Sequence, residues 1–161
     1  MTLRYLPEHV ESVRLALDLA NKEASHLHYS CATLFALGID LEWVQALAVR
    51  PELAEKVEAF VSRFGRLQDH LGGKLLPRFA ALLGDNSRTL LDTLAFAEKA
   101  NLLSNAEDFI AARRLRNALV HEYMHDAQVF LESLFEAQKA CEMFLSIIRK
   151  IETELHSREV P

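Results

Sequence analysis

The C-terminal part of the chain carries apolar side chains at the spacing of an α-helix, and no other feature of the sequence restricts the fold as strongly. The positions follow one another at steps of four and three residues: Phe130, Leu134, Ala137, Cys141, Phe144, Ile148, Ile151 and Leu155. An α-helix turns once in about 3.6 residues, so this spacing places all of them on one face. An apolar face of this length must be buried by packing against other helices, and we therefore expect a helical bundle, a helical dimer or both.

The rest of the sequence is also typical of an all-α protein. Leu, Ala and Glu are the commonest residues, and all three form helices readily, whereas only five glycines and four prolines occur in 161 residues. The chain has 161 residues, half of them apolar. This is long enough for one domain with a core of its own and too short for two such domains. We predict a single all-α domain over residues 1–161.

Prolines and glycines indicate where the first helices begin and end. A first helix is predicted over residues 7–37, with Pro7 at its start and Gly38 after its end. A short helix should follow over residues 41–49, and Pro51 opens a longer one. The longer helix carries a second apolar face, made of Leu53, Val57, Phe60, Phe64, Leu67 and Leu71. The segment "LGGKLLP" should interrupt it, because two glycines weaken a helix and a proline restricts the residue before it.

Capping residues indicate where the remaining helices begin. After a helix predicted over residues 87–101, Ser104 and Glu107 have the spacing of a capping box, which places the start of the next helix there. Asp126 is a suitable N-cap for the last helix. The preceding helix must therefore end between Val120 and Asp126.

Charge and hydropathy exclude some classes of function. The net charge of −5 argues against an extended basic surface that coats nucleic acid, so any contact with nucleic acid must be local. No apolar run approaches the roughly 20 residues that span a bilayer, and the first residues lack the apolar core of a secretory signal. We expect a cytoplasmic protein without membrane contact. Cys31 and Cys141 are expected to be buried thiols in a reducing compartment, and we assign them no chemistry.

The segment "HEYMH", residues 121–125, matches the H-E-x-x-H pattern of zinc proteases. Such a site needs His121 and His125 one turn apart on one continuous helix, with Glu122 as the base. The helix end predicted before Asp126 removes that geometry. We therefore expect neither a metal site nor another cofactor.

The segment "RRLRNALVHEY", residues 113–123, concentrates charged and polar side chains in an otherwise apolar stretch. Its R-x4-H spacing, from Arg116 to His121, is weak by itself, because Arg4 and His9 have the same spacing without any other motif residue. The longer string R-N-x-x-x-H-x-Y is more specific, and it consists of Arg116, Asn117, His121 and Tyr123.

This string resembles the signature of the HEPN domains (higher eukaryotes and prokaryotes nucleotide-binding), in the toxin branch that is paired with minimal nucleotidyltransferases. The family motif has an arginine, a polar residue beside it, a histidine and often a tyrosine two residues further on. Residues 97–123 resemble the family's penultimate helices, and residues 60–77 resemble an earlier one. The resemblance covers about residues 50–155 and is most specific across residues 116–123.

The resemblance implies an up-and-down bundle of four to five helices that forms a homodimer and brings two copies of the motif into one cleft. It implies a metal-independent endoribonuclease that acts as a toxin on RNA, with Arg116 and His121 as the catalytic residues. It further implies a nucleotidyltransferase antitoxin as a partner protein. In some such systems the partner adds AMP to the motif tyrosine, here Tyr123.

The residue types suit this chemistry. RNA is cut without metal when a 2′-hydroxyl attacks the neighbouring phosphate, which requires a proton acceptor near neutral pH and a cation for the growing negative charge. His121 can act as base or acid, because imidazole titrates in that range. Arg116 offers planar donors that match phosphate oxygens. Asn117 can orient the histidine or donate to the phosphate, and Tyr123 can donate a hydrogen bond.

Helical geometry complicates the pairing of Arg116 with His121. At about 100° per residue, Arg114, Asn117 and His121 share one face, whereas Arg116 lies about 140° away from His121. Either the helix unwinds before His121, or Arg116 acts together with residues of a second protomer. Arg114 is a candidate substitute or helper for Arg116.

A second group of charged residues lies within the earlier helix, at steps of three residues: Arg63, Arg66 and Asp69. We interpret these residues as a solvated stripe, with Asp69 as the exception that can line the cleft.

Two alternatives stand beside the ribonuclease prediction. In a purely structural interpretation, Arg113 and its neighbours complement the dipole of a helix C-terminus, and Tyr123 packs against another helix. In a second functional hypothesis, the protein is a non-catalytic nucleotide- or substrate-binding partner subunit of a nucleotidyltransferase. The acidic charge favours that partner subunit, whereas the intact Arg116 and His121 favour the enzyme.

Overall fold

The computed structural model describes residues 4–123 and 125–161, and the regular structure of these residues is entirely helical. The prediction of an all-α fold is therefore confirmed. In chain order, the elements are the 3₁₀ turn η1 (Pro7–His9), α1 (Val10–Phe35), α2 (Leu41–Ala46), η2 (Leu47–Val49), α3 (Pro51–His70), the π-helical turn η3 (Leu71–Leu75), α4 (Leu76–Leu82), α5 (Leu90–Lys99), α6 (Ala106–His121) and α7 (Ala127–Ser157). None of the helices in the described ranges is long and apolar enough to cross a membrane.

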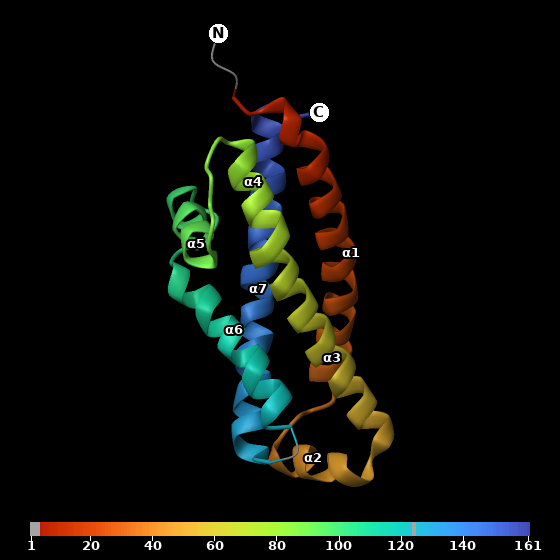
Figure 1. Ribbon diagram of the computed structural model, residues 1–161. Coiled ribbons are helices and arrows are strands. Elements are labelled where there is room, and N and C mark those ends of the chain that lie inside the picture. Colours follow the sequence, from red (N-terminus) through yellow and green to blue (C-terminus); the bar gives the residue numbers. More distant parts are fainter. Residues whose placement is uncertain (1–3, 124) are drawn as a thin grey trace.

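The longer helices lie side by side along one common direction (Figure 1). Helix α3 packs against α1, α6 and α7, and α6 and α7 pack against each other. The short helix α2 crosses one end of the molecule, and the first described residues lie with the C-terminus at the opposite end (Figure 1). Helix α5 is set to one side, where it contacts α4, η3 and α6. This arrangement places α6, which carries the arginine and histidine motif, directly beside α3.

The apolar face predicted for the last helix is the centre of the core. All eight of its positions are buried in α7, from Phe130 to Leu155. Phe144 in the middle of this face lies 5.2 Å, between ring centroids, from Phe64 of α3 and 6.1 Å from Phe109 of α6. Burial of such a side chain stabilises the fold by roughly 1.5–3 kcal/mol. The apolar face of α7 therefore holds α3 and α6 at the spacing that forms the candidate site.

The predicted start of the last helix is confirmed, whereas the helix predicted over residues 87–101 is shorter, at Leu90–Lys99, and the start of the next helix is shifted. Asp126 caps α7, since its carboxylate accepts hydrogen bonds from the backbone N–H groups of Gln128 and Val129, both at 3.1 Å. The capping box predicted at Ser104 and Glu107 is wrong. Helix α6 begins one residue later than that box requires, and the side chain of Asn105 caps it by accepting from the N–H of Asp108 at 3.0 Å.

The predicted interruption at "LGGKLLP" is wrong, because the chain stays helical from α3 into α4. Residues Leu71–Leu75 form a widened π-helical turn, and Pro77 follows directly after this turn, as the second residue of α4. Gly72 serves packing here, because a Cβ at this position would lie 3.0 Å from Cε1 of Phe109. The glycine lets α6 approach the turn closely.

The two cysteines carry free thiols and face each other from α1 and α7. Cys141 is buried as predicted, whereas Cys31 is only half-buried, so the prediction of two buried thiols holds for Cys141 alone. A hydrogen bond between the side chains lowers the pKa of the Cys31 thiol. The same hydrogen bond, together with burial, raises the pKa of the Cys141 thiol. The pair therefore contains one more acidic and one less acidic sulfur.

Candidate functional site

Helix α6 carries the motif of residues 113–123, and it remains a regular helix through His121. The N–H of Glu122 still donates to the carbonyl of Ala118 at 2.8 Å, so the hydrogen-bond ladder is intact beneath the histidine. The possibility that the helix unwinds before His121 is therefore wrong. The predicted end of the helix between Val120 and Asp126 is confirmed, because the chain leaves the helix only after His121.

A groove of about 370 Å³ runs between α3 and α6, and we call it the α3–α6 groove. Its wall on α6 and on the segment after it consists of Arg116, Leu119, Val120 and Tyr123. Its wall on α3 consists of Glu58, Val61, Ser62, Gly65, Arg66 and Asp69. Thus two of the residues expected in the site from the motif, Arg116 and Tyr123, meet Asp69 from the earlier helix in one place.

Arg116 is held in this groove by a charge and by a close approach of the two helices. Its Nη2 lies 3.2 Å from Oδ2 of Asp69. Its stem lies over Gly65, where a Cβ would be 2.9 Å from Nε of Arg116 and 3.3 Å from Cγ. The arginine side chain remains 40% exposed. The other guanidinium N–H groups can therefore still donate to an incoming anion, for which phosphate is the best geometric match.

Tyr123 lies in the turn after α6 and closes one end of the groove. Its ring packs edge-on against Phe130, with 5.2 Å between ring centroids. Burial and the nearby carboxylate of Glu58 both raise the pKa of the Tyr123 phenol. The hydroxyl is therefore protonated at neutral pH and is available there as a hydrogen-bond donor.

The remaining motif residues lie on another side of α6. Arg114, Asn117 and His121 are all exposed, and none of them lines the α3–α6 groove. The single chain therefore brings Arg116, Asp69 and Tyr123 together but leaves His121 on a neighbouring face. This is the separation of about 140° that an unbroken helix dictates between positions 116 and 121.

The two arginines next to Asp69 have different roles. Arg63 donates to Oγ of Ser30 at 2.6 Å and to the carbonyl of His26 at 3.2 Å, so it ties α3 to α1. The interpretation of Arg63 as part of a solvated stripe is therefore wrong. Arg66 is exposed at the groove and donates to Ser62 within its own helix. Asp69 pairs with Arg116, as the exception made for it anticipated.

The segment "HEYMH" does not have the geometry of a zinc-protease helix. Helix α6 ends at His121, so His125 lies beyond it, and Met124 falls outside the described residues. Among residues 4–123 and 125–161, no cluster of three His, Cys, Asp or Glu side chains could hold a metal ion.

Sequence reasoning missed Gly65 as a determinant of the site. Its only signal is a glycine in the middle of a strongly helical stretch, where alanine would favour the helix by roughly 1 kcal/mol. The structure supplies the reason for the glycine, because the space above it is filled by Arg116 of another helix.

Comparisons of the chain with models of known protein families, with curated protein sequences and with solved structures gave no match.

Proposed function

We propose that this protein is a metal-independent endoribonuclease of the HEPN toxin type, which acts as a homodimer on RNA. The observation that carries the proposal is the placement of Arg116. This arginine belongs to the R-N-x-x-x-H-x-Y string, and its guanidinium sits in a groove, fixed by Asp69, with donors left for a phosphate. An up-and-down HEPN bundle with one such motif per protomer is consistent with the lengthwise packing of the helices.

Two protomers are needed because Arg116 and His121 lie on different sides of α6. A two-fold axis beside the end of α6 would bring His121 of one chain to the groove of its partner. Val120, which lies between the two sides, supports this arrangement, because its apolar side chain is 59% exposed in the single chain. A protein contact at this end of α6 would cover it.

The reaction follows from the roles of the two residues. His121 accepts the proton of a ribose 2′-hydroxyl, and the 2′-oxygen attacks the adjacent phosphorus. Arg116 stabilises the additional negative charge on the phosphate oxygens. The bond to the 5′-oxygen of the next nucleotide breaks, and that oxygen takes up a proton. The products are a 2′,3′-cyclic phosphate and a free 5′-hydroxyl.

Asp69 and Tyr123 complete the groove in this proposal. Asp69 fixes the orientation of the guanidinium, and Tyr123 donates a hydrogen bond as a neutral phenol. A phenol at the rim of the groove is also accessible to a modifying enzyme. A partner nucleotidyltransferase that attached AMP to Tyr123 would fill the groove beside Arg116 and silence the toxin.

A second candidate function is favoured by the separation of Arg116 from His121 in the single chain. If the protein does not dimerise through α6, the groove lacks a proton acceptor of the right kind. It would then bind a nucleotide or a segment of substrate for a nucleotidyltransferase without cutting it. Asn117 and Arg114, exposed on the face of α6 that carries His121, would contact the partner in that case.

The two candidates are separated by cleavage of a single-stranded RNA in the presence of EDTA, with the protein free of partner and of AMP. The enzyme should cut the RNA and leave 2′,3′-cyclic phosphate ends. His121→Ala should slow the cleavage by about 10²- to 10⁴-fold, the usual contribution of a general base. His125→Ala, which removes a nearby exposed histidine outside the motif, should cut at the wild-type rate. A wild-type protein that leaves the RNA intact would refute the ribonuclease and favour the binding subunit.

A further inference from the structure

The two cysteines of the chain lie at nearly the same level of the bundle, where α1 and α7 pack together in opposite directions (Figure 1). Nδ2 of Asn21 in α1 donates to Oε1 of Glu152 in α7 at 2.8 Å. The cysteine of α1 lies ten residues after this amide, and the cysteine of α7 lies eleven residues before this carboxylate. Beyond the cysteines the helices are still in contact, since the rings of Phe35 and Phe135 lie 6.0 Å apart between centroids. Because a helix rises about 1.5 Å per residue, these steps place the two thiols opposite each other.

The thiol pair is buried on one side and open on the other. Cys141 belongs to the apolar face of α7 and is only 6% exposed. Cys31 continues the buried face of α1 one turn after Leu27, and it is half-buried. Cys141 donates a hydrogen bond to the sulfur of Cys31, which lowers the pKa of the Cys31 thiol. Cys31 is therefore the sulfur that solvent reaches and that ionises first, and Cys141 lies directly behind it.

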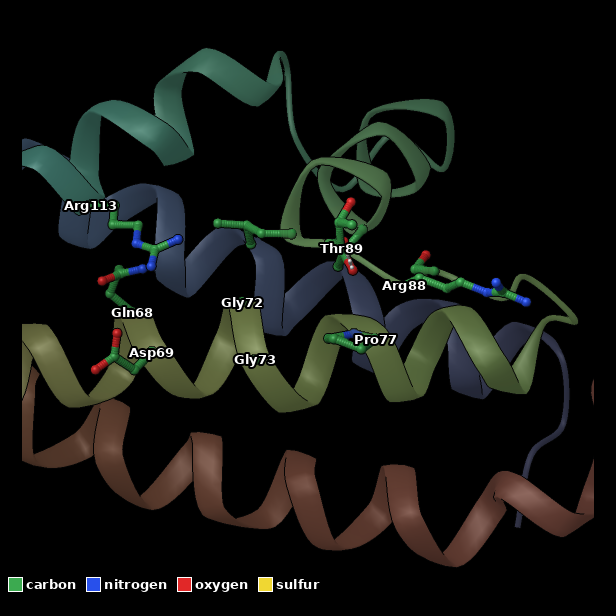
Figure 2. Close-up of a pocket in the computed structure, with 11 residues that line it drawn as sticks. Gln68, Asp69, Gly72, Gly73, Pro77, Arg88, Thr89 and Arg113 are labelled. Carbon is green, nitrogen blue, oxygen red and sulfur yellow. Dashed lines mark hydrogen bonds between the residues drawn. The ribbon is translucent and has the colours of Figure 1, made fainter.

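The thiol pair is separate from the candidate site and from the pocket next to it. That pocket, of about 400 Å³, lies between the end of α3 and the start of α5, with Asp69 on one wall, Thr89 opposite and Arg113 at one end (Figure 2). Neither cysteine lines this pocket or the α3–α6 groove. A reaction at the thiols can therefore be tested without altering any residue of the proposed ribonuclease.

We propose that Cys31 and Cys141 form a redox modification site, at which a hydroperoxide produces a disulfide between α1 and α7. Cys31 is the sulfur that attacks the peroxide, and Cys141 is the sulfur that then displaces the oxygen. An accessible, readily ionised thiol with a second thiol beside it is the arrangement that this chemistry needs. The proposal does not depend on the proposed ribonuclease activity.

The reaction has two steps. The thiolate of Cys31 attacks one oxygen of hydrogen peroxide, the O–O bond breaks, and Cys31 becomes a sulfenic acid. The other oxygen leaves as hydroxide, which takes up the proton that Cys31 released and becomes water. The sulfur of Cys141 then attacks the sulfur of Cys31, the S–O bond breaks, and the hydroxide leaves with the proton of Cys141 as a second water. The two sulfurs together lose two electrons, which reduce the peroxide.

The disulfide would close a loop that runs from position 31 to position 141. This loop contains α2 through α6, and thus both walls of the α3–α6 groove. A cross-link over so long a loop restricts the unfolded chain strongly, so the oxidised protein should resist unfolding more than the reduced one. In a reducing compartment such a bond is transient, because thiols reduce it again.

Mass spectrometry of the full chain tests whether the bond forms. Dilute protein, reduced with dithiothreitol and then freed of it, is treated with hydrogen peroxide and denatured in N-ethylmaleimide, which labels every remaining thiol. The wild type should lose both thiols and the mass of two hydrogen atoms, and dithiothreitol should restore them. Because the chain has two cysteines, an intrachain bond has a single possible pairing.

Three results of this experiment would overturn the proposal. The first is a protein that keeps both thiols after the treatment. The second is a disulfide between two chains, seen as a dimer on a non-reducing gel. The third is oxidation of Cys31 to a sulfinic acid while Cys141 stays a free thiol.

Single variants test the role of each sulfur. In Cys141→Ala, Cys31 should stop at the sulfenic acid, which dimedone traps as a stable adduct. In Cys31→Ala, the buried Cys141 should remain a thiol under the same treatment. The wild type should give little adduct, because the second thiol removes the sulfenic acid. A dimedone adduct of Cys141 in Cys31→Ala that forms as fast as the adduct of Cys31 in Cys141→Ala would contradict the assigned roles.

Thermal unfolding tests whether the bond fits the packed helices. The oxidised wild type should melt about 5 °C or more above the reduced protein, and dithiothreitol should remove the difference. Cys31→Ala and Cys141→Ala should each melt at the same temperature with and without peroxide. An oxidised wild type that melts no higher than the reduced protein would show that the two thiols do not face each other as the native bundle places them.

Discussion

The side chain of Arg116 occupies the space that Gly65 leaves open on the neighbouring helix. A Cβ at position 65 would be 2.9 Å from Nε of Arg116, which is closer than carbon and nitrogen atoms pack. The same guanidinium reaches Asp69, one turn further along α3, at 3.2 Å. Arg116, the residue proposed to bind the phosphate, is thus positioned both by the absence of a side chain at Gly65 and by the carboxylate of Asp69.

Gly65→Ala should separate stability from activity. Alanine favours a helix interior, so the free energy of unfolding measured in urea should stay the same or rise by up to about 1 kcal/mol. The added methyl group displaces the flexible arginine, and RNA cleavage should fall. Gly73→Ala gains the same helix propensity in open space and should leave cleavage unchanged. Unaltered cleavage by Gly65→Ala would show that the position of Arg116 in the groove does not matter.

Asp69→Asn should affect cleavage more than folding. Both members of the ion pair are substantially exposed, at 40% and 52%, so its loss should cost under about 1 kcal/mol of unfolding free energy. The guanidinium loses its fixed orientation, and cleavage should slow. Glu136→Gln is the matched control, because it breaks another exposed ion pair, with Lys139 on α7, away from the groove. If both variants cut RNA at the wild-type rate, Asp69 has no positioning role.

Mixed protomers test whether the site contains two chains. Arg116→Ala and His121→Ala should each be inactive alone. If Arg116 of one chain acts with His121 of its partner, a mixed dimer has one intact site. An equal mixture with free subunit exchange should then recover about a quarter of the wild-type activity. A mixture that stays inactive after confirmed exchange would place the two residues in the same chain or outside the mechanism.

Tyr123 should ionise later than an ordinary tyrosine. Burial and Glu58 raise its pKa above the unperturbed value of 10.0, because both disfavour the phenolate. Since the unfolded chain releases this proton first, the contribution of Tyr123 to stability is complete below pH 10 and declines as the pH rises from there toward the folded pKa. The difference in phenolate absorbance between the wild type and Tyr123→Phe should therefore reach half of its final size only above pH 10. A difference that is already half complete at or below pH 10 would contradict the raised pKa of this hydroxyl.

The thiol pair should react one sulfur at a time. The hydrogen bond from Cys141 lowers the pKa of Cys31, while that hydrogen bond and burial raise the pKa of Cys141. Because the thiolate is the reactive form, brief treatment with iodoacetamide at pH 8 should label Cys31 first. Mass spectrometry of the peptides reports the order, and Cys31→Ser should nearly abolish the early labelling. Equal rates at both sulfurs would show that the hydrogen bond does not distinguish them.

The features of this protein that can be predicted from its sequence depend on residues that are close together in the chain. The apolar spacing from Phe130 to Leu155 predicts the buried face of α7, and Asp126 marks its first turn, because helical periodicity and capping act over three or four residues. The separation of Arg116 from His121 follows from the same local geometry. The motif of residues 116–123, and the separation of Arg116 from His121 within it, could therefore be derived without a structure.

The features that position the candidate site depend on residues far apart in the chain. Gly65 makes room for Arg116, Gly72 makes room for Phe109, and the helix continues through "LGGKLLP" where local rules predict an interruption. Each glycine alone reads as a weak point of a helix. Their role becomes apparent only in the close packing of α3 against α6, because the side chain that fills the space above each glycine belongs to another helix.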